Sequence, residues 1–224
     1  MSKKALVEKR PFLVLSVCAA LLYYFVQDSA MPDPFLVLIK GSAVGLLAVY
    51  AWLRHGSQSA RLLAAALVAA AIGDMAIRFD FVAGGAAFFV YHVIALALFL
   101  RHKGKPMEGK DSLIFITLLL GTPLLAWYLP ADEGMRIPVA LYALALGAMA
   151  AGAWASDFPR RMVGAGGVLF VISDLLIFSE MGPLADSVLP ALLIWPTYYL
   201  GVFLITVGVI TTLRKRAPEL RVVH

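Results

Sequence analysis

The sequence has few charged residues, few histidines and one cysteine, and each shortage excludes a class of protein. Charged residues make up 15% of the 224 residues and hydrophobic residues 62%, whereas about a quarter of a soluble domain is charged. A water-soluble enzyme of this size is therefore excluded. Cys18 is the single cysteine, which excludes an internal disulfide framework and a metal site built on cysteines. The net charge of +5 does not indicate nucleic acid binding, because in a membrane protein the loops that carry the positive charge matter more than the sum.

Long apolar segments dominate the rest of the sequence. A helix needs about 20 apolar residues to cross a bilayer, and a transmembrane barrel would show shorter alternating segments instead. The first segment is expected to be retained as a membrane helix, because cleavage as a signal peptide would leave seven passes and disrupt the charge alternation of the loops. The sequence therefore predicts an all-α membrane protein, a single polytopic domain over residues 1–224. Its eight expected transmembrane helices lie at about 11–27, 34–53, 60–77, 81–100, 112–129, 136–154, 161–179 and 188–213.

Basic residues gather at alternate connections between these segments. Sixteen of the 19 lie at the two termini or in the second, fourth and sixth loops, whereas the other four loops hold only Arg78 and Arg136. Because basic loops stay in the cytoplasm, both termini are expected there, in a multi-pass protein of the cell membrane. The sixteen residues are Lys3, Lys4, Lys9, Arg10, Arg54, Arg61, Arg101, Lys103, Lys105, Lys110, Arg160, Arg161, Arg214, Lys215, Arg216 and Arg221.

A short segment recurs at an offset of 100 residues. Residues 73–77 (GDMAI) align with residues 173–177 (SDLLI), and each segment ends an odd-numbered predicted helix that runs outward. Four passes separate them, which is typical of parallel repeats related by an axis along the membrane normal. Two parallel four-helix repeats are one interpretation, and chance similarity between two apolar helix ends is the other. Either topology places Asp74 and Asp174 at similar depth.

Three ionisable residues lie inside the predicted helices, namely Lys40, Asp74 and Asp174, and His92 lies deeper. An ionisable group at the bilayer centre costs at least about 2.5–3.5 kcal/mol on insertion scales, so each of these residues is a candidate for function. Together they predict a polar cavity in the outer half of the bundle. A purely structural alternative is an ion pair between Lys40 and one aspartate, with the other aspartate hydrogen-bonded between helices.

Two carboxylates close together in a medium of low dielectric constant favour a state in which one holds a proton, and such a pair supplies a general acid and a general base. Other reaction classes fit less well. The sequence contains no Gly-x-Ser-x-Gly motif of serine hydrolases. A catalytic zinc site usually needs three protein ligands, and His92 is the only histidine at depth. The Gly-x-Gly-Asp motif of intramembrane aspartyl proteases lacks its first glycine, because Ala71 stands there.

Taken in order, these features resemble the YhhN-like lysoplasmalogenase family of eight-pass membrane proteins. The likeness extends over nearly the whole chain. The lysine of the family is commonly followed by proline, whereas Gly41 follows Lys40 here. The residues that carry the resemblance are Lys40, then Gly73 and Asp74 with Phe81 to Gly84, Phe88, Phe89 and His92, then residues 169–174 (LFVISD) with the glycines before them, and the pair Tyr198 and Tyr199.

The resemblance implies hydrolysis of the vinyl ether bond of lysoplasmalogens, which yields a fatty aldehyde and glycerophosphocholine or glycerophosphoethanolamine. It implies a lysophospholipid substrate and the lipid bilayer as partners, and no metal or organic cofactor. Asp74 and Asp174 would be the acid–base pair, with their individual roles open. The residues expected to bind or orient the substrate or the pair are Lys40, His92, Ser173, Tyr198, Tyr199 and Arg78.

A function of a different class stays open. Buried carboxylates in a repeated helical bundle are also typical of proton-coupled transporters. The alternative is therefore a carrier of a small amphiphile that uses the same carboxylates as a proton relay.

Overall fold

The computed structural model describes residues 11–104 and 106–216, and the regular elements of that part of the chain are helices. An antiparallel bridge between Lys103 and Ser156 joins two loops. The predicted all-α class is confirmed. The α-helices are α2 (Pro11–Val26), α3 (Asp33–Arg54), α4 (Gln58–Ala76), α5 (Phe81–Arg101), α6 (Lys110–Ile116), α7 (Thr122–Tyr128), α8 (Arg136–Ala155), α9 (Ala165–Glu180) and α10 (Leu189–Arg216).

Seven helical segments of the described chain are long and apolar enough to cross a membrane. The helix α2 is also apolar but shorter, with 16 residues. The protein is therefore a multi-pass membrane protein. The seven segments are Asp33–Arg54, Gln58–Ala76, Phe81–Arg101, Lys110–Tyr128, Glu133–Ala155, Arg160–Glu180 and Leu189–Arg216.

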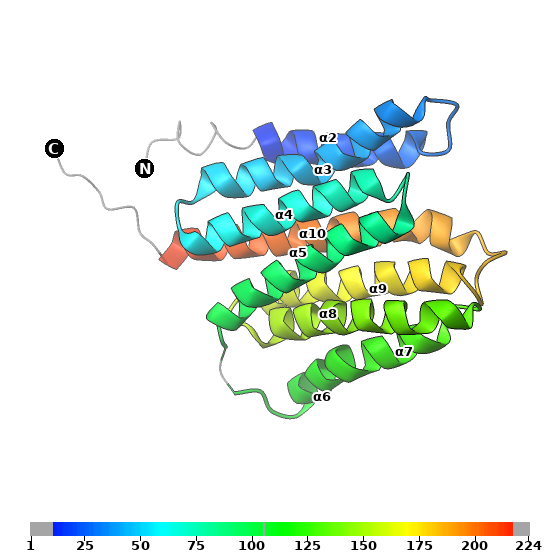
Figure 1. Ribbon diagram of the computed structural model, residues 1–224. Coiled ribbons are helices and arrows are strands. Elements are labelled where there is room, and N and C mark those ends of the chain that lie inside the picture. The colour runs from blue at the N-terminus through cyan, green and yellow to red at the C-terminus, as the bar shows by residue number, and fades with distance from the viewer. Residues whose placement is uncertain (1–10, 105, 217–224) are drawn as a thin grey trace.

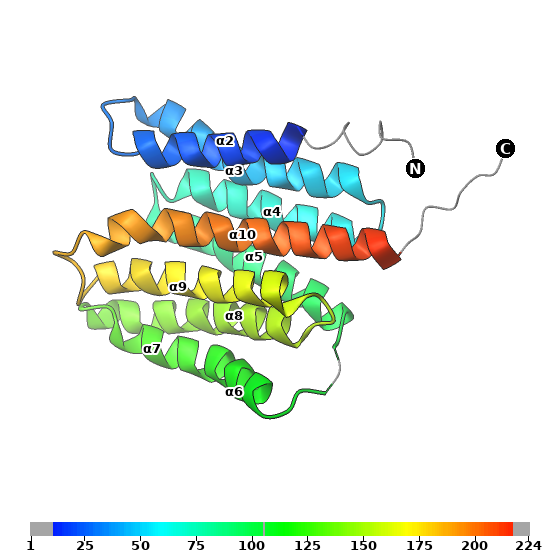
Figure 2. The same cartoon turned by 180° about the vertical axis from the view of Figure 1, so that it is seen from behind.

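Short loops separate these helices, and capping side chains begin α4 and α5. The Ser57 hydroxyl accepts a hydrogen bond from the Ala60 N–H at 3.2 Å and caps α4. The Asp80 carboxylate accepts from the N–H groups of Val82 and Ala83 at 2.8 and 2.9 Å and caps α5. Such side chains satisfy N–H groups that the first helical turn leaves free. Because the connections are short, successive helices run antiparallel, side by side along one direction (Figures 1 and 2).

The two ends of the bundle differ in charge. The end that carries the α4–α5 loop is called the acidic end, since the described basic residues in its loops and at its helix ends are Arg78 and Arg136. The end at which α10 finishes is called the basic end. The acidic residues of the first are Asp28, Asp33, Asp80, Asp132, Glu133, Glu180 and Asp186, and the described basic residues of the second are Arg54, Arg61, Arg101, Lys103, Lys110, Arg160, Arg161, Arg214, Lys215 and Arg216.

The predicted helix 112–129 is interrupted near its middle. A π-helical turn, Thr117–Gly121, separates α6 from α7. Pro123 has no N–H to donate to the carbonyl four residues earlier, and such a gap is commonly absorbed by a wider turn. On the facing helix α8, a Cβ at Gly147 would collide with the carbonyl oxygen of Leu118. The glycine therefore lets the irregular turn lie directly against α8.

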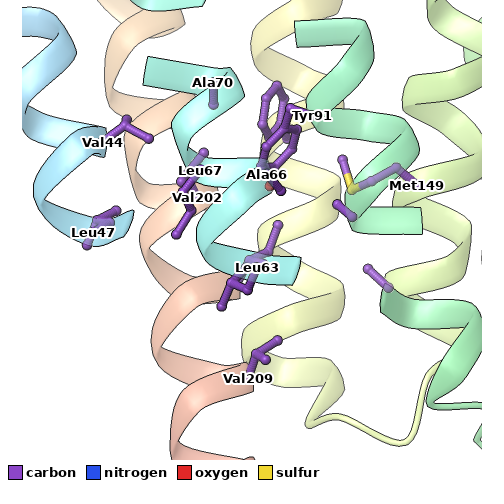
Figure 3. Close-up of a cluster of buried hydrophobic side chains, with 14 of the residues drawn as sticks. Val44, Leu47, Leu63, Ala66, Leu67, Ala70, Tyr91, Met149, Val202 and Val209 are labelled. Atoms are coloured by element: carbon purple, nitrogen blue, oxygen red, sulfur yellow. The ribbon is translucent and has the colours of Figure 1, made fainter. Parts of the chain in front are cut away.

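The hydrophobic core surrounds α4, which packs against α3, α5 and α10 (Figures 1 and 3). Helices α9 and α10 also approach closely, because a Cβ at Gly166 would lie 2.6 Å from the carbonyl oxygen of Gly201. In lipid the hydrophobic effect does not drive helices together, and small residues such as these glycines allow the close van der Waals packing that does. The core side chains labelled in Figure 3 are Val44, Leu47, Leu63, Ala66, Leu67, Ala70, Tyr91, Met149, Val202 and Val209.

The oblique course of α5 shapes the acidic end. A Cβ at Gly84 would lie 2.6 Å from the Cβ of Ile77, so α5 begins in close contact with the end of α4. Towards the basic end, a Cβ at Gly152 of α8 would lie 2.9 Å from the Leu96 side chain of α5. The helix therefore crosses the bundle from α4 to α8 (Figure 1), and α5 and α8 lie farther apart at the acidic end than at the basic end.

Candidate active site

A cavity of about 730 Å³ lies between α3, α4, α5, α8, α9 and α10 near the acidic end. This volume is within the range of ligand sites, roughly 300–1,000 Å³. Most of the lining is apolar. The polar side chains that line it are Tyr23, Gln27, Lys40, Asp74, Tyr142, Ser173, Asp174, Glu180, Trp195 and Tyr198.

Asp74 lies in the last turn of α4 and is buried. Its Oδ2 accepts a hydrogen bond from the Tyr198 hydroxyl of α10 at 2.8 Å, and its Oδ1 lies 3.8 Å from Lys40 Nζ of α3. The residue before it is a glycine because a Cβ at Gly73 would lie 2.9 Å from the ring of Phe88. One carboxylate thus receives a phenol and an ammonium from two different helices.

Lys40 lies between the carboxylate of Asp74 and two aromatic rings. Its Nζ is 5.6 Å from the ring centre of Tyr23 and 5.7 Å from that of Trp195, both within the distance of a cation–π contact. The Trp195 indole N–H donates to the Ala20 carbonyl at 2.9 Å, which fixes its ring. The ammonium is therefore stabilised inside an apolar bundle by one negative charge and two ring faces.

Asp174 has a different set of partners. The Tyr142 hydroxyl of α8 donates to its Oδ2 at 2.7 Å. The Nε2 of His92 on α5 lies 3.0 Å from the same hydroxyl and 3.7 Å from Asp174 Oδ2. Histidine, tyrosine and carboxylate thus form a connected group on three helices, in which His92 and Asp174 are buried and Tyr142 is partly buried. Such a group can pass a proton through its hydroxyl, whereas the surroundings of Asp74 supply a fixed positive charge.

Three other residues that the sequence predicted for the site, Ser173, Tyr199 and Arg78, differ in whether they line the cavity. Ser173 lines the cavity and donates to the Ile194 carbonyl at 3.0 Å. Tyr199 does not line the cavity, and its hydroxyl is 2.8 Å from the Ser16 hydroxyl. This differs from the expected role of Tyr199, because consecutive residues of a helix point about 100° apart and Tyr198 already faces the cavity. Arg78 lies in the α4–α5 loop, outside the cavity.

Arg78 forms an exposed ion pair at the acidic end. Its Nη2 lies 2.7 Å from Asp33 Oδ1, and this hydrogen bond and the negative charge of Asp33 raise the pKa of the guanidinium above its usual range. Exposed pairs of this kind add little to stability. The pair connects the start of α3 to the α4–α5 loop, and neither residue lines the cavity.

Five of the polar residues that line the cavity were not predicted from the sequence, and Gln27, just after α2, is one of them. Tyr142 and Trp195 carry hydrogen bonds within the cavity, Tyr23 lies beside Lys40, and Glu180 lines it from the end of α9. A tyrosine hydroxyl inside an apolar helix needs a hydrogen-bond partner, and for Tyr142 this was the available signal.

A metal ion has no evident ligand set in the described part of the chain, where no group of three or more His, Cys, Asp or Glu residues converges.

Comparison with known proteins places this site in a family. The sequence pattern of the YhhN family matches residues 35–209, a range that contains both aspartates and most of the cavity. The lysoplasmalogenases of Mycobacterium bovis and Mycobacterium tuberculosis are each 30% identical over 178 residues, which cover 75% of this chain and 68% of theirs. No solved structure matches the chain. The chain belongs to the YhhN family.

Proposed function

We propose that the protein is a membrane-embedded lysoplasmalogenase, which hydrolyses the vinyl ether bond of a lysoplasmalogen to a fatty aldehyde and a glycerophosphocholine or glycerophosphoethanolamine. The observation that carries the proposal is one largely apolar cavity lined by both Asp74 and Asp174, in a chain similar to two proteins named lysoplasmalogenase. An apolar lining suits a single hydrocarbon chain, and a few convergent polar groups suit the bond to be cut.

The reaction requires one proton donor, one stabilising anion and water. A carboxylic acid protonates the vinyl carbon distal to the ether oxygen, and the remaining carbon and oxygen share the positive charge of an oxocarbenium ion. Water adds to that carbon and gives up a proton, and the resulting hemiacetal collapses to the aldehyde and the glycerol hydroxyl. The sum consumes one water molecule, and a pair of carboxylates can supply every proton transfer.

The different partners of the two aspartates suggest different roles. Lys40 supplies a positive charge beside Asp74, so Asp74 is suited to remain a carboxylate that stabilises the cation and receives the proton of the attacking water. Asp174 is bonded by a phenol that also contacts His92, so it is suited to donate the first proton and to be reprotonated afterwards. The tyrosine hydroxyl would hold the Asp174 carboxylate in place once its proton has left.

The test of the function is direct detection of the aldehyde. Purified protein in nanodiscs is incubated with lysoplasmalogens of both headgroups, with the matching saturated ether lysolipids, and with acyl lysolipids. Aldehyde release from the vinyl ethers without any ion gradient is expected, whereas a proton-coupled carrier would release none. Absence of aldehyde from every vinyl ether, with folded protein, would contradict the proposal.

The hydroxyl of Tyr142 offers a more specific prediction. Tyr142→Phe removes the hydrogen bond to Asp174 and the link to His92 without changing the packing of the ring. A hydrogen bond to a charged group contributes about 1.5–3 kcal/mol, so kcat is expected to fall about ten- to hundredfold with little change in KM. Steady-state kinetics of aldehyde release measure both constants.

Tyr91→Phe is the matched control for this variant. The Tyr91 side chain is fully buried near the same group, but its hydroxyl has no hydrogen-bond partner within the described residues and the residue does not line the cavity. Its kcat should stay close to that of the unchanged protein. Equal losses in the two variants would show that the Tyr142 hydroxyl has no special role.

We further propose that all eight helical passes span the membrane, with both termini in the cytoplasm and the cavity in the outer half. The gathering of basic residues at one end of the bundle supports this orientation. The 16 described residues of α2 extend about 24 Å, so α2 would need a few preceding residues to match the hydrocarbon core. The basic residues Lys3, Lys4, Lys9, Arg10, Lys105 and Arg221, which also entered the predicted orientation, lie outside the described residues.

The proposal of two parallel four-helix repeats is supported by the contacts of the aspartates. In this division, α2 to α5 form one half and α6 to α10 the other, with α6 and α7 counted as one pass. Each aspartate lies on the third pass of its half. Each contacts one side chain from the second pass of its own half and one from the last pass of the other half, as a two-fold axis requires. These contacts are Asp74 with Lys40 and Tyr198, and Asp174 with Tyr142 and His92.

A further inference from the structure

Part of the cavity lining is exposed on the outside of the bundle. On α5, Val82 and Val90 line the cavity and are exposed, as is Phe89 beside them. On α8, Pro138 and Leu141 also line the cavity and are exposed. These five residues are apolar, and each both lines the cavity and is exposed, on one of the two helices α5 and α8. The cavity is therefore continuous with the lipid-facing surface of the bundle at this position, which is called the α5–α8 opening.

The course of α5 explains why the opening exists and where it ends. Towards the basic end, α5 and α8 are in contact through Leu96 and Gly152. Nearer the acidic end, the two helices are joined by the hydrogen bond between His92 of α5 and Tyr142 of α8. Towards the acidic end, α5 runs obliquely away from α8 and towards α4 (Figure 1). The hydrogen bond thus lies at the inner limit of the opening, beside Asp174.

We propose that the α5–α8 opening is the binding site of the hydrocarbon chain of a single-chain lipid, which enters from the bilayer between the two helices and remains partly in the bilayer during turnover. This inference rests on the proposed function, since it assigns a path to the substrate of the same site. The polar part of the lipid would lie towards the acidic end, with its vinyl ether bond between Asp74 and Asp174.

The apolar side chains of the opening favour a hydrocarbon chain over a polar ligand. The charged residues that line the cavity, Lys40, Asp74, Asp174 and Glu180, lie on α3, α4 and α9, whereas the rim of the opening is formed by apolar side chains of α5 and α8. A hydrocarbon chain leaves no polar group unsatisfied there, whereas a headgroup or a water-soluble substrate would lose hydrogen bonds to water. Because the chain end stays in lipid, cleavage should depend only weakly on chain length beyond the carbons that contact the rim.

The first test blocks the opening with tryptophan. Val90→Trp and Leu141→Trp are expected to lower kcat/KM for a lysoplasmalogen at least about tenfold, because binding pockets discriminate against a misfit of this size by at least that factor. Val68 on α4 and Leu124 on α7 are matched controls that do not line the cavity. Val68 is 50% exposed against 47% for Val90, and Leu124 is 63% exposed against 61% for Leu141. Val68→Trp and Leu124→Trp should stay within about twofold.

The second test detects binding without turnover. In a Cys18→Ser background, a single cysteine replaces Leu141 or Leu124 and carries a fluorophore. The probe is a saturated ether lysophosphatidylcholine, which has no vinyl ether to cleave, with a nitroxide on its chain, titrated into nanodiscs. Quenching at position 141 should saturate and be competed by unlabelled lysolipid, whereas quenching at position 124 should rise linearly as in bulk lipid.

The outcomes separate this proposal from the proposed function. Saturable quenching at position 141 supports the opening as a lipid site even if no lysoplasmalogen is cleaved, in which case only the proposed reaction is wrong. Normal turnover in both Val90→Trp and Leu141→Trp, with equal linear quenching at both labelled positions, would overturn the opening while leaving the reaction in place.

Discussion

Replacing Asp74 or Asp174 by asparagine is expected to lower aldehyde release about 10²–10⁴-fold, the usual contribution of a general acid or base. Asparagine keeps the size of the side chain, and its amide oxygen can still accept a hydrogen bond from the hydroxyl of Tyr198 or Tyr142. It cannot protonate a vinyl carbon, and it carries no negative charge to stabilise an oxocarbenium ion. Both variants should therefore lose kcat, measured by the initial rate of aldehyde release at saturating lysoplasmalogen.

The control for these variants is an aspartate at the same end of the bundle that has no part in the site. Asp186 is exposed in the α9–α10 loop and does not line the cavity, so Asp186→Asn should keep the wild-type rate. Thermal unfolding of each variant in detergent shows whether the bundle is intact. A folded Asp74→Asn or Asp174→Asn protein with near wild-type turnover would rule out the mechanism that uses two carboxylates.

The sequence identified three of the four charged residues that line the cavity, because ionisable residues are rare in apolar helices. Lys40, Asp74 and Asp174 stood out for that reason alone, and the structure places all three in the lining of one cavity. Tyr142 and Trp195 did not stand out, since aromatic residues are ordinary in membrane helices. Their hydrogen-bonded positions depend on which face of each helix meets its neighbours, and hydropathy does not determine that.

The apolar character of the passes was predictable in the same way, because it is set by composition over about 20 residues. The local geometry of the helices was not. The π-helical turn Thr117–Gly121 follows from the combination of Pro123 with a glycine on a different helix, Gly147. The oblique course of α5 likewise depends on glycines at two contacts, Gly84 and Gly152. Pairings between distant segments of this kind leave no periodic signal in a single sequence.

The ion pair of Lys40 yields the second large effect. Lys40→Met is expected to destabilise the protein by about 3 kcal/mol, the low end of the range for breaking a buried pair, because the lysine side chain keeps 19% exposure. The cause is the negative charge of Asp74, which would be left in the apolar bundle with the Tyr198 hydroxyl as its remaining bond. Denaturant titration in mixed micelles measures the change in the free energy of unfolding. Lys110→Met, at an exposed position near the basic end, is the control and should change it little.

The double variant Lys40→Met/Asp74→Asn separates stability from catalysis. With both charges absent, no unpaired ion is buried, so most of the lost stability should return. Turnover should not return, because the carboxylate needed for the cationic intermediate is still missing. Recovery of stability without activity would assign the lysine to holding the Asp74 carboxylate in its charged form. If Lys40→Met instead matched the unchanged protein in both stability and turnover, Asp74 would need no ammonium, and the proposed difference between the two aspartates would be wrong.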